Sequence, residues 1–443
     1  MQPGGVVWSC TIGPGLVMKV VVDVSELKIG MYVYELDRPW RETPFMFQGF
    51  EIRSQQELDT LSKYCRSVTI LSLEASHRNA PQREAGSAGV VTAGKPTPYR
   101  SLGVEREVYK INNHPNARSV YSDVTSMPEE VNNVRDAFID SRLLVQELLH
   151  DAKFGRSMNY RGAKQAVQSM AESVIRNPDA LMCFAQLKRK DEYIALHSLR
   201  VCILALAFGR QLGLSRDQLE VLGLGALLHD IGMVKVPEEI LGKPDALTPA
   251  ESELMKQHVV WGADMLYESR QIPSAAIEVV TAHHERYDGS GYLNGLRGEQ
   301  IGDFGMIGAI VDHYDAVTSD RVYHGAISAH SALMQLYGWR NTLFSAPLAE
   351  KFIQCLGIYP IGSVVELNSG DIGVVAAINR EQRLKPHVML AYRADRQPYV
   401  EMPIANIATH RTPDNRPCEI ERVLESGAID IDPAHYLRKA VGL

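Results

Sequence analysis

Paired cysteines, an excess of positive charge and long apolar runs are all missing from this chain of 443 residues. Its six cysteines are scattered without a CxxC pair, which argues against a disulfide framework and a thiolate zinc site and favours a reducing cytoplasm. The formal net charge of −7 gives no obvious attraction for duplex nucleic acid or an anionic membrane. The longest apolar run in the body of the chain, Val201 to Gly209, is too short to cross a bilayer. We therefore expect a cytoplasmic protein that binds neither duplex nucleic acid nor a membrane.

The spacing of apolar residues changes along the chain and predicts a multi-domain protein. Strand-like runs and one helical pattern come first, helical spacing dominates the middle, and strand-like runs return around the turn sequence at residues 368–371. A stretch rich in Ala, Gly, Pro and Ser separates the first two regions and predicts a flexible linker. The predicted segments are a disordered extension over residues 1–17, a small α+β domain over 18–74, the linker over 75–125, an all-α domain over 126–358 and a small β-rich region over 359–443.

Within the all-α segment, apolar residues at helical spacing predict the individual helices. A long amphipathic helix is expected from about residue 128, followed by helices near 161–175, 192–211, 216–229, 251–268, 274–284 and 304–318. Gly232 is expected to end the helix that carries the dipeptide His229–Asp230.

Histidines gather in this segment, because eight of the fourteen fall between His197 and His330. Several of them, with two aspartates, occupy helix faces that are otherwise apolar, where burying an unpartnered polar group is costly. The set consists of His197, His229, Asp230, His258, His283, His284 and Asp312. A single histidine on an apolar face is more often a satisfied core residue than a ligand. The whole set together is better explained by a metal cluster.

The donor types narrow the chemistry of such a cluster. Imidazole nitrogen and carboxylate oxygen without thiolate suit Fe or Mn, with Ni, Co and Zn as alternatives. Seven ligands exceed what one ion needs and are about right for two divalent ions with Asp230 as a bridge. Two ions about 3.5–4 Å apart are the usual arrangement for phosphoester hydrolysis. Asp315 follows Asp312 by three positions on the same helix face and is expected to orient a ligating histidine.

At these residues the sequence resembles the HD-GYP family, a branch of the HD phosphohydrolases that hydrolyse the bacterial messenger cyclic di-GMP. The resemblance runs through HS at 197–198, LLHDIG at 227–232, VPEEIL at 236–241, His258, HHERYDGSGY at 283–292 and DHYDAVTSDRVY at 312–323. It implies an HD-type helical domain with the same seven metal ligands, among which His229 and Asp230 are the catalytic pair. It also implies that Arg321 grips a phosphate of the ligand. Residues 28–73 resemble a small domain often found ahead of such modules.

Four departures from the family pattern are visible. Tyr193 stands where members that bind a third ion have Glu, which favours two ions over three. Met233 replaces a lysine that contacts phosphate in the family, and Lys235 is the nearest lysine in the sequence. Leu293 replaces the proline of a surface turn implicated in partner docking, and His324 replaces a basic residue as a weaker, pH-dependent cation. Arg321, Lys235 and His324 are therefore the candidate substrate-binding residues.

The resemblance implies a metal-dependent phosphodiesterase that hydrolyses cyclic di-GMP to pGpG, with GMP as a candidate further product. A hydroxide bridging the two ions is the expected nucleophile, without a separate general base. Two alternatives stay open: a catalytically weak cyclic di-GMP receptor that signals through the N-terminal domain, and an HD hydrolase of another nucleotide phosphoester. Besides cyclic di-GMP, the candidate partners are a second copy of the chain and a diguanylate cyclase or another signalling protein.

Overall fold

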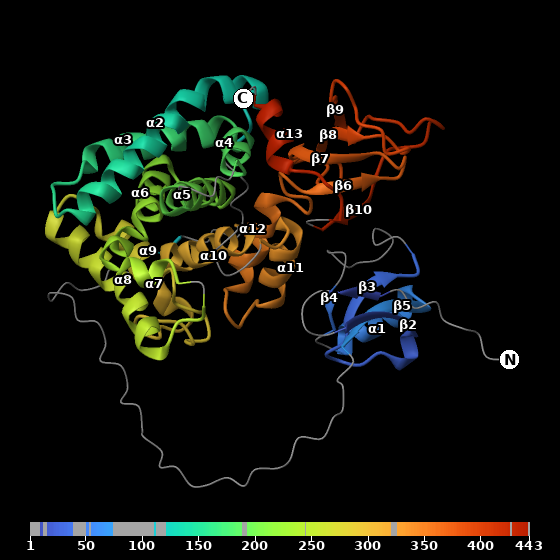
Figure 1. Ribbon diagram of the computed structural model, residues 1–443, viewed down its shortest axis with the longest axis horizontal. Helices are drawn as coiled ribbons and strands as arrows, with labels where there is room; N and C mark the ends of the chain where they lie inside the picture. Colours follow the sequence, from blue (N-terminus) through green and yellow to red (C-terminus); the bar gives the residue numbers. More distant parts are fainter. Residues whose placement is uncertain are drawn as a thin grey trace, which may run out of the picture. The chain divides into compact units, whose positions relative to one another are not determined.

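The chain folds into two compact units, Met1–Pro96 and Thr97–Leu443, seen in the computed structural model in Figure 1. The structure describes residues 9–11, 16–38, 50–52, 55–73, 110–111, 121–187, 193–243, 245–319, 326–425 and 428–441.

The first unit is built on a five-stranded antiparallel sheet with strand order β1-β2-β5-β3-β4. Its strands are β1 (Ser9–Thr11), β2 (Leu16–Asp23), β3 (Tyr32–Leu36), β4 (Phe50–Glu51) and β5 (Ser67–Leu73), and its helix is α1 (Gln55–Tyr64). Leu61 of α1 packs with Val33, Val68 and Ile70 of the sheet to form the core. Strand β1 lies within residues 1–17, for which we expected a disordered extension. The division of the chain into five segments stays a prediction.

The second unit is mostly helical. Its α-helices before the C-terminal sheet are α2 (Met127–Lys153), α3 (Tyr160–Arg176), α4 (Pro178–Ala185), α5 (Tyr193–Gln211), α6 (Arg216–Leu228), α7 (Glu238–Leu241), α8 (Pro249–Ser269), α9 (Ser274–Ala282), α10 (Asp303–Thr318), α11 (Ala329–Gly338) and α12 (Ala346–Leu356). Short 3-10 helices occur at η4 (Ile231–Lys235) and η5 (Gly298–Ile301). Helix α5 packs against α6 and α10, and α9 packs against α6, α8 and α10. These central helices carry most of the candidate site residues.

Local sequence signals set where several of these helices begin. The side chains of Ser126, Ser215 and Thr248 each accept a hydrogen bond from the backbone amide three residues later. The Glu or Gln side chain at that later position accepts a hydrogen bond from the backbone amide of the capping residue. This reciprocal cap satisfies amides that the first turn of a helix leaves without a partner. The helices α2, α6 and α8 thus begin where their sequences predict.

Gly232 has a different role from the expected one. Helix α6 ends at Leu228 with His229 as its cap, four residues before Gly232. A Cβ atom at Gly232 would lie 1.9 Å from the carbonyl oxygen of His258, far inside van der Waals contact. The glycine therefore lets η4 approach the backbone of α8, which brings Asp230 near His258.

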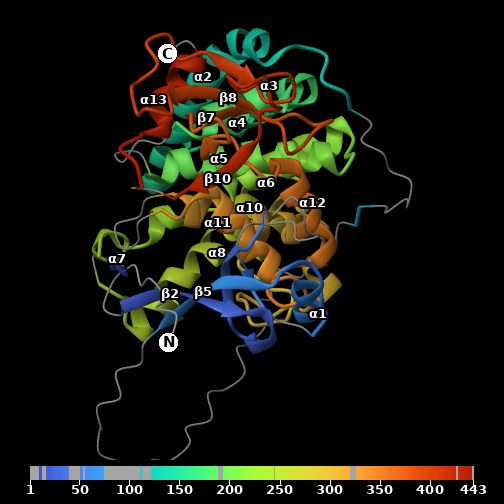
Figure 2. The same ribbon diagram turned by 90° about the vertical axis from the view of Figure 1, so that its right-hand side faces the viewer.

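A second antiparallel sheet follows α12, with strand order β10-β6-β7-β8-β9. Its strands are β6 (Val364–Leu367), β7 (Ile372–Ala377), β8 (His387–Tyr392), β9 (Ile404–Asn406) and β10 (Ile420–Leu424). The turn at residues 368–371 joins β6 to β7, and Gly370 adopts a φ of 85° there, a conformation that favours glycine. Helix α13 (Pro433–Ala440) then packs on β7 and β8; Figure 2 gives a second view of these elements.

A chain of ion pairs, the Asp179 network, links this sheet to the helices. Asp179 of α4 accepts a hydrogen bond from the Ile378 amide at 3.1 Å and pairs with Arg380. Arg380 also lies 2.7 Å from Asp123, which pairs with Arg210 of α5 at 2.9 Å. Asp179 and Arg210 are almost fully buried. The C-terminal sheet thus shares one polar network with the helical domain.

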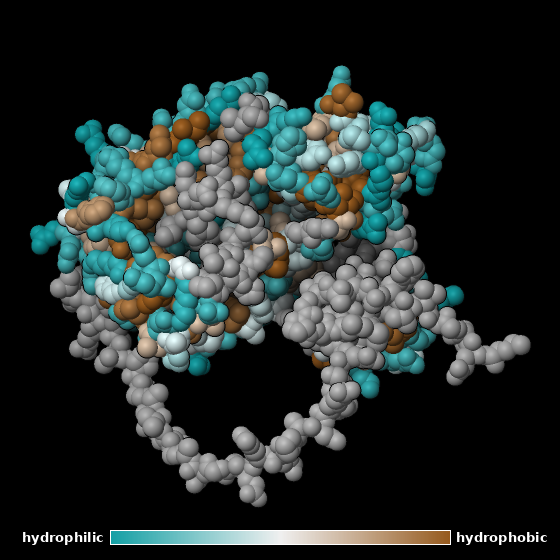
Figure 3. All heavy atoms as spheres, in the orientation of Figure 1, coloured by the Kyte–Doolittle hydropathy of each residue, from teal (hydrophilic) through white to brown (hydrophobic). Residues whose placement is uncertain are grey.

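Hydrophobic residues on the visible face of the second unit occur as separate patches among hydrophilic ones (Figure 3). Of the helices in the described parts of the chain, none combines the length and the hydrophobicity needed to cross a membrane.

Candidate metal centre

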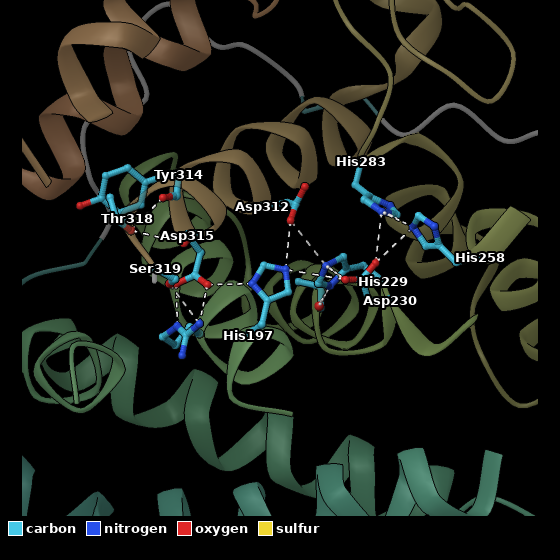
Figure 4. A network of polar contacts seen from close by, with 12 residues as sticks. His197, His229, Asp230, His258, His283, Asp312, Tyr314, Asp315, Thr318 and Ser319 are labelled. Atoms are coloured by element: carbon cyan, nitrogen blue, oxygen red, sulfur yellow. Dashed lines mark hydrogen bonds and ion pairs between the residues drawn. The ribbon is translucent and has the colours of Figure 1, made fainter. Parts of the chain in front are cut away.

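The structure brings together all seven residues that the sequence singled out. His197 lies in α5, His229 and Asp230 follow α6, His258 lies in α8, His283 and His284 follow α9, and Asp312 lies in α10. Their side chains point toward one another in the interior of the helical domain, where Figure 4 labels all of them except His284. Five of the seven are buried and the other two, Asp230 and His284, are half-buried.

Asp230 lies between two groups of imidazoles. Its Oδ1 atom is 3.2 Å from His258 Nε2 and 3.6 Å from His283 Nε2. Its Oδ2 atom is 3.4 Å from His229 Nε2 and 3.7 Å from His197 Nε2. Each carboxylate oxygen therefore faces a different pair of ring nitrogens.

The ligand atoms form two clusters that share Asp230. The first contains Asp230, His258, His283 and His284, and the second contains His197, His229 and Asp230; within each, the ligand atoms lie within 4.8 Å of one another. Asp312 adjoins the second cluster, because its Oδ1 atom is 3.1 Å from His197 Nε2 and 3.7 Å from His229 Nε2. Both clusters have the size and donor types of a site for one metal ion.

Backbone carbonyls orient three of the histidines. In each case Nδ1 donates a hydrogen bond to the carbonyl oxygen three residues earlier: Ala226 for His229 at 2.8 Å, Met255 for His258 at 2.7 Å and Val280 for His283 at 2.8 Å. A carbonyl oxygen can only accept, so the proton of the neutral ring sits on Nδ1 and the Nε2 lone pair faces the cluster. Histidines that bind metals through Nε2 are commonly held in this way.

His229 provides a direct test of whether a cation fits. Its Nε2 atom is fully buried and has no hydrogen-bond partner among the described residues. The nearest carboxylate oxygens are those of Asp230 and Asp312, at 3.4 and 3.7 Å. An unpartnered nitrogen lone pair in the interior is costly, and a metal ion would satisfy it. The donor set therefore fits a bound metal.

A carboxylate orients the fourth histidine. His197 Nδ1 lies 2.7 Å from Asp315 Oδ2, and Arg200 holds the same carboxylate with two nitrogens at 2.7 and 2.9 Å. Asp315 therefore contacts the ring nitrogen of His197 that points away from the cluster, and its orienting role stays a prediction. Arg200 was not predicted, although it follows His197 by three residues on the same helix and is a charged residue within an apolar run.

Electrostatics favour ionised carboxylates in the cluster. Burial alone would favour neutral Asp230 and Asp312, but the imidazoles around them lower both pKa values well below the usual range. Burial and the neighbouring ring of His283 lower the pKa of His284 well below its usual value. For His197, burial is outweighed by Asp312 and Asp315, which raise its pKa to about 9. The ionised carboxylates and the neutral His284 ring are already in the forms that bind metal ions, whereas His197 would have to lose a proton to bind one.

The segment after His284 forms one wall of the site. The Tyr292 ring stacks on His284, with ring centres 4.5 Å apart and planes at 23°. Buried Glu285 accepts hydrogen bonds from the amides of Asn294 and Leu296 at 2.7 and 2.9 Å. Glu285 therefore fixes the loop that carries Tyr292. Neither Glu285 nor Tyr292 was assigned a role of its own from the sequence, although both lie in the HHERYDGSGY motif.

Of the three predicted substrate-binding residues, the structure describes Lys235. Lys235 is exposed at the end of η4, and Met233 is half-buried in the same short helix. Arg321 and His324 lie outside the described residues.

Comparison with known families gives two matches. The HD domain family matches residues 182–344, which contain all seven clustered residues. A domain of unknown function, DUF3391, matches residues 19–163, a range that continues past the predicted linker into α3.

Three relatives are similar to this chain over different shares of its length. A protein of Pseudomonas aeruginosa named cyclic di-GMP phosphodiesterase is 34% identical over 84% of this chain and 85% of its own length. A cyclic di-GMP phosphodiesterase of Thermotoga maritima is 36% identical over 36% of this chain and 43% of its own length. A 3'3'-cGAMP-specific phosphodiesterase of Vibrio cholerae is 32% identical over 36% of this chain and 30% of its own length. With these matches and its HD and DGSGY motifs, the chain belongs to the HD-GYP family of HD-domain proteins.

Proposed function

We propose that this protein is a metal-dependent phosphodiesterase that hydrolyses cyclic di-GMP. The observation that carries the proposal is the position of Asp230, whose two carboxylate oxygens face different pairs of imidazole nitrogens at 3.2–3.7 Å. A carboxylate so placed is suited to join two cations, and pairs of cations are the usual agents of phosphoester hydrolysis. The name of the Pseudomonas relative, which matches along most of the chain, supports cyclic di-GMP as the substrate.

Two divalent ions would be held by the two clusters. His258, His283 and His284 would bind one ion, His197, His229 and Asp312 would bind the other, and Asp230 would contact both. Nitrogen and oxygen donors of this kind suit Fe or Mn, with Ni, Co and Zn as alternatives. Two ions are proposed rather than three because Tyr193 occupies the position of the additional acidic ligand.

When bound, such ions supply an activated water for attack on phosphorus and neutralise charge on the phosphate oxygens. The residues of the chain prepare the site for this reaction. Asp230 sets the spacing of the two clusters, and the Nδ1 hydrogen bonds place the proton of each neutral ring on Nδ1 and direct Nε2 inward. Arg321 would bind a phosphate oxygen through its guanidinium group, with His324 and Lys235 as weaker cations. The product would be linear pGpG, and a second cleavage would give GMP.

The test combines metal analysis with an activity assay on one sample purified without oxygen. We expect about two transition-metal ions per chain and conversion of cyclic di-GMP to pGpG. Replacement of both His229 and Asp230 by Ala should abolish turnover while the protein stays folded by circular dichroism. Full activity of that variant after metal loading would show that the proposal is wrong.

Other cyclic dinucleotides form the second candidate substrate class. The Vibrio relative is named for 3'3'-cGAMP, so both dinucleotides should be assayed under the same conditions. A receptor without activity is the less favoured reading, because a protein that only binds the ligand has little need for a complete set of metal ligands. Binding of cyclic di-GMP without turnover in protein loaded with Mn²⁺ or Fe²⁺ would reverse that preference.

A further inference from the structure

We infer that Arg200 is a positioning residue that fixes the orientation of His197 by immobilising Asp315. The inference goes beyond the proposed ligand set, and it rests on the proposed function only in taking His197 as a metal ligand. The contacts of Arg200 include two hydrogen bonds to the Asp315 carboxylate and one to the Ser319 hydroxyl.

His197 differs from three other histidines of the cluster in how its outer nitrogen is held. His229, His258 and His283 donate to backbone carbonyls of their own helices, which cannot turn away while the helix is folded. His197 depends instead on the Asp315 side chain, 2.7 Å from its Nδ1 atom. A carboxylate can rotate about its side-chain bonds, so this contact orients His197 only if another group fixes Asp315.

Arg200 supplies that constraint through two directed contacts. Its Nε atom donates to Asp315 Oδ1 at 2.7 Å, and its Nη2 atom donates to Asp315 Oδ2 at 2.9 Å. The guanidinium thus prevents the carboxylate from rotating, and Asp315 Oδ2 stays directed at His197 Nδ1. Arg200 and Asp315 are both nearly fully buried, at 4% and 3% exposure, so water does not weaken the pair. Figure 4 shows the Asp315 carboxylate directed at the His197 ring, with Ser319 close by.

The pairing follows from the spacing of two facing helices. His197 and Arg200 lie three residues apart on α5, and Asp312 and Asp315 lie three residues apart on α10. Residues three apart share a helix face, so each helix presents two polar groups to the other. His197 meets Asp312 at 3.1 Å through Nε2 and Asp315 through Nδ1. Arg200 neutralises the charge of Asp315, while Asp312 lies at the Nε2 atom of His197, which faces the proposed metal site.

A third contact extends the effect of Arg200 to the end of α10. Its Nη2 atom lies 3.2 Å from the Ser319 hydroxyl oxygen, and Ser319 is the residue that caps α10. Arg200 therefore ties α5 to α10 at the end of the helix that carries Asp312. Loss of Arg200 should misalign His197 and Asp312 together, which are both assigned to the second cluster.

The test measures metal binding directly. Metal-free wild type, R200Q, R200K and D315N proteins are titrated with Co²⁺ followed by its visible absorption, and with Mn²⁺ followed by calorimetry. Removing the partner that orients a ligating histidine typically weakens metal binding by about 10- to 100-fold. We expect a loss of this size for one of the two ions only, with a changed Co²⁺ spectrum for that ion. R200K should recover only part of the affinity, because an ammonium group cannot hold both carboxylate oxygens in a plane.

Arg210 provides a matched control on the same helix. Like Arg200, it is 4% exposed and pairs with an aspartate, Asp123. It lies ten residues after Arg200, and its hydrogen bonds are to Asp123 and to the Ile175 carbonyl, outside the seven clustered residues. R210Q should lower the thermal midpoint as a buried-pair deletion does, yet bind both ions as the wild type does. A general loss of packing would affect R200Q and R210Q alike.

Coupling between the two residues gives the decisive comparison. If Arg200 acts through Asp315, the R200Q/D315N double variant should lose no more affinity than D315N alone. The inference is overturned if R200Q, or R200K should R200Q not fold, binds both ions with wild-type affinity and spectrum. It is also overturned if the losses of R200Q and D315N simply add. Failure of the proposed function would appear differently, as an inactive wild type that still binds two ions.

Discussion

Replacing Arg380 by methionine tests whether the C-terminal sheet and the helical domain are one folded unit. Arg380 follows β7, and its guanidinium pairs with Asp179 of α4 and with Asp123. Methionine keeps much of the apolar stem of the side chain and removes the charge. Asp179, whose side chain is 3% exposed, would then keep the Ile378 amide as its donor from the sheet but lose its cation.

The expected cost follows from the burial of the two partners. Removing one partner of a fully buried ion pair costs about 3–5 kcal/mol, because the other charge is left without compensation. Here the Arg380 side chain is 33% exposed, so water screens part of the interaction, and the amide donor remains. We therefore expect R380M to lower the free energy of unfolding by about 2–3 kcal/mol.

Urea denaturation followed by circular dichroism measures this change. The control is R438M in helix α13, whose pair with Asp432 has side chains 42% and 62% exposed and should contribute less than about 0.5 kcal/mol. Combining R380M with D179N should cost less than the sum of the single changes. Equal stability of R380M and R438M, or a separate unfolding transition of the C-terminal sheet in the wild type, would refute the reasoning.

Three further changes have defined outcomes. D230N should reduce bound metal from about two ions per chain to one or fewer and turnover by more than about 100-fold, since one of its two ligand oxygens becomes an amide nitrogen; metal analysis and initial rates measure both. G232A should cost about 1–3 kcal/mol and weaken metal binding, because a Cβ atom there meets the His258 carbonyl, whereas G242A, with its nearest contact at 3.3 Å, should behave like the wild type in thermal melts. Treatment with a chelator should lower the thermal midpoint and Mn²⁺ should restore it, since an ion at about 100 times its Kd stabilises the folded state by about 2.7 kcal/mol; an unchanged midpoint would contradict binding at the cluster.

Much of the helical domain could be predicted because its helices have one apolar face. The helix predicted at 161–175 is observed as Tyr160–Arg176, and the one predicted at 304–318 as Asp303–Thr318. Helix α4 was missed because all eight of its residues are buried, so it shows no alternation between polar and apolar faces. Strand β10 is short and mostly polar, and its pairing with β6 is a contact between segments more than fifty residues apart.

The seven clustered residues of the site could be predicted from residue type and from their position on apolar helix faces. Histidines and aspartates on apolar helix faces are conspicuous, so the seven clustered residues could be named before their arrangement was known. Arg200 and Glu285 could not be assigned roles in this way, because an arginine or a glutamate is ordinary in a sequence until its partner is known. Asp315, the partner of Arg200, lies 115 residues away.

The carbonyls that hold His229, His258 and His283 belong to the same helices as the rings they orient. Folding of the helices therefore orients the Nε2 atoms of these three histidines before any metal ion binds. The same arrangement can be used in protein design. A histidine in the last turn of a helix that ends at a cavity can donate Nδ1–H to the carbonyl oxygen three residues earlier, which directs its Nε2 lone pair into the cavity.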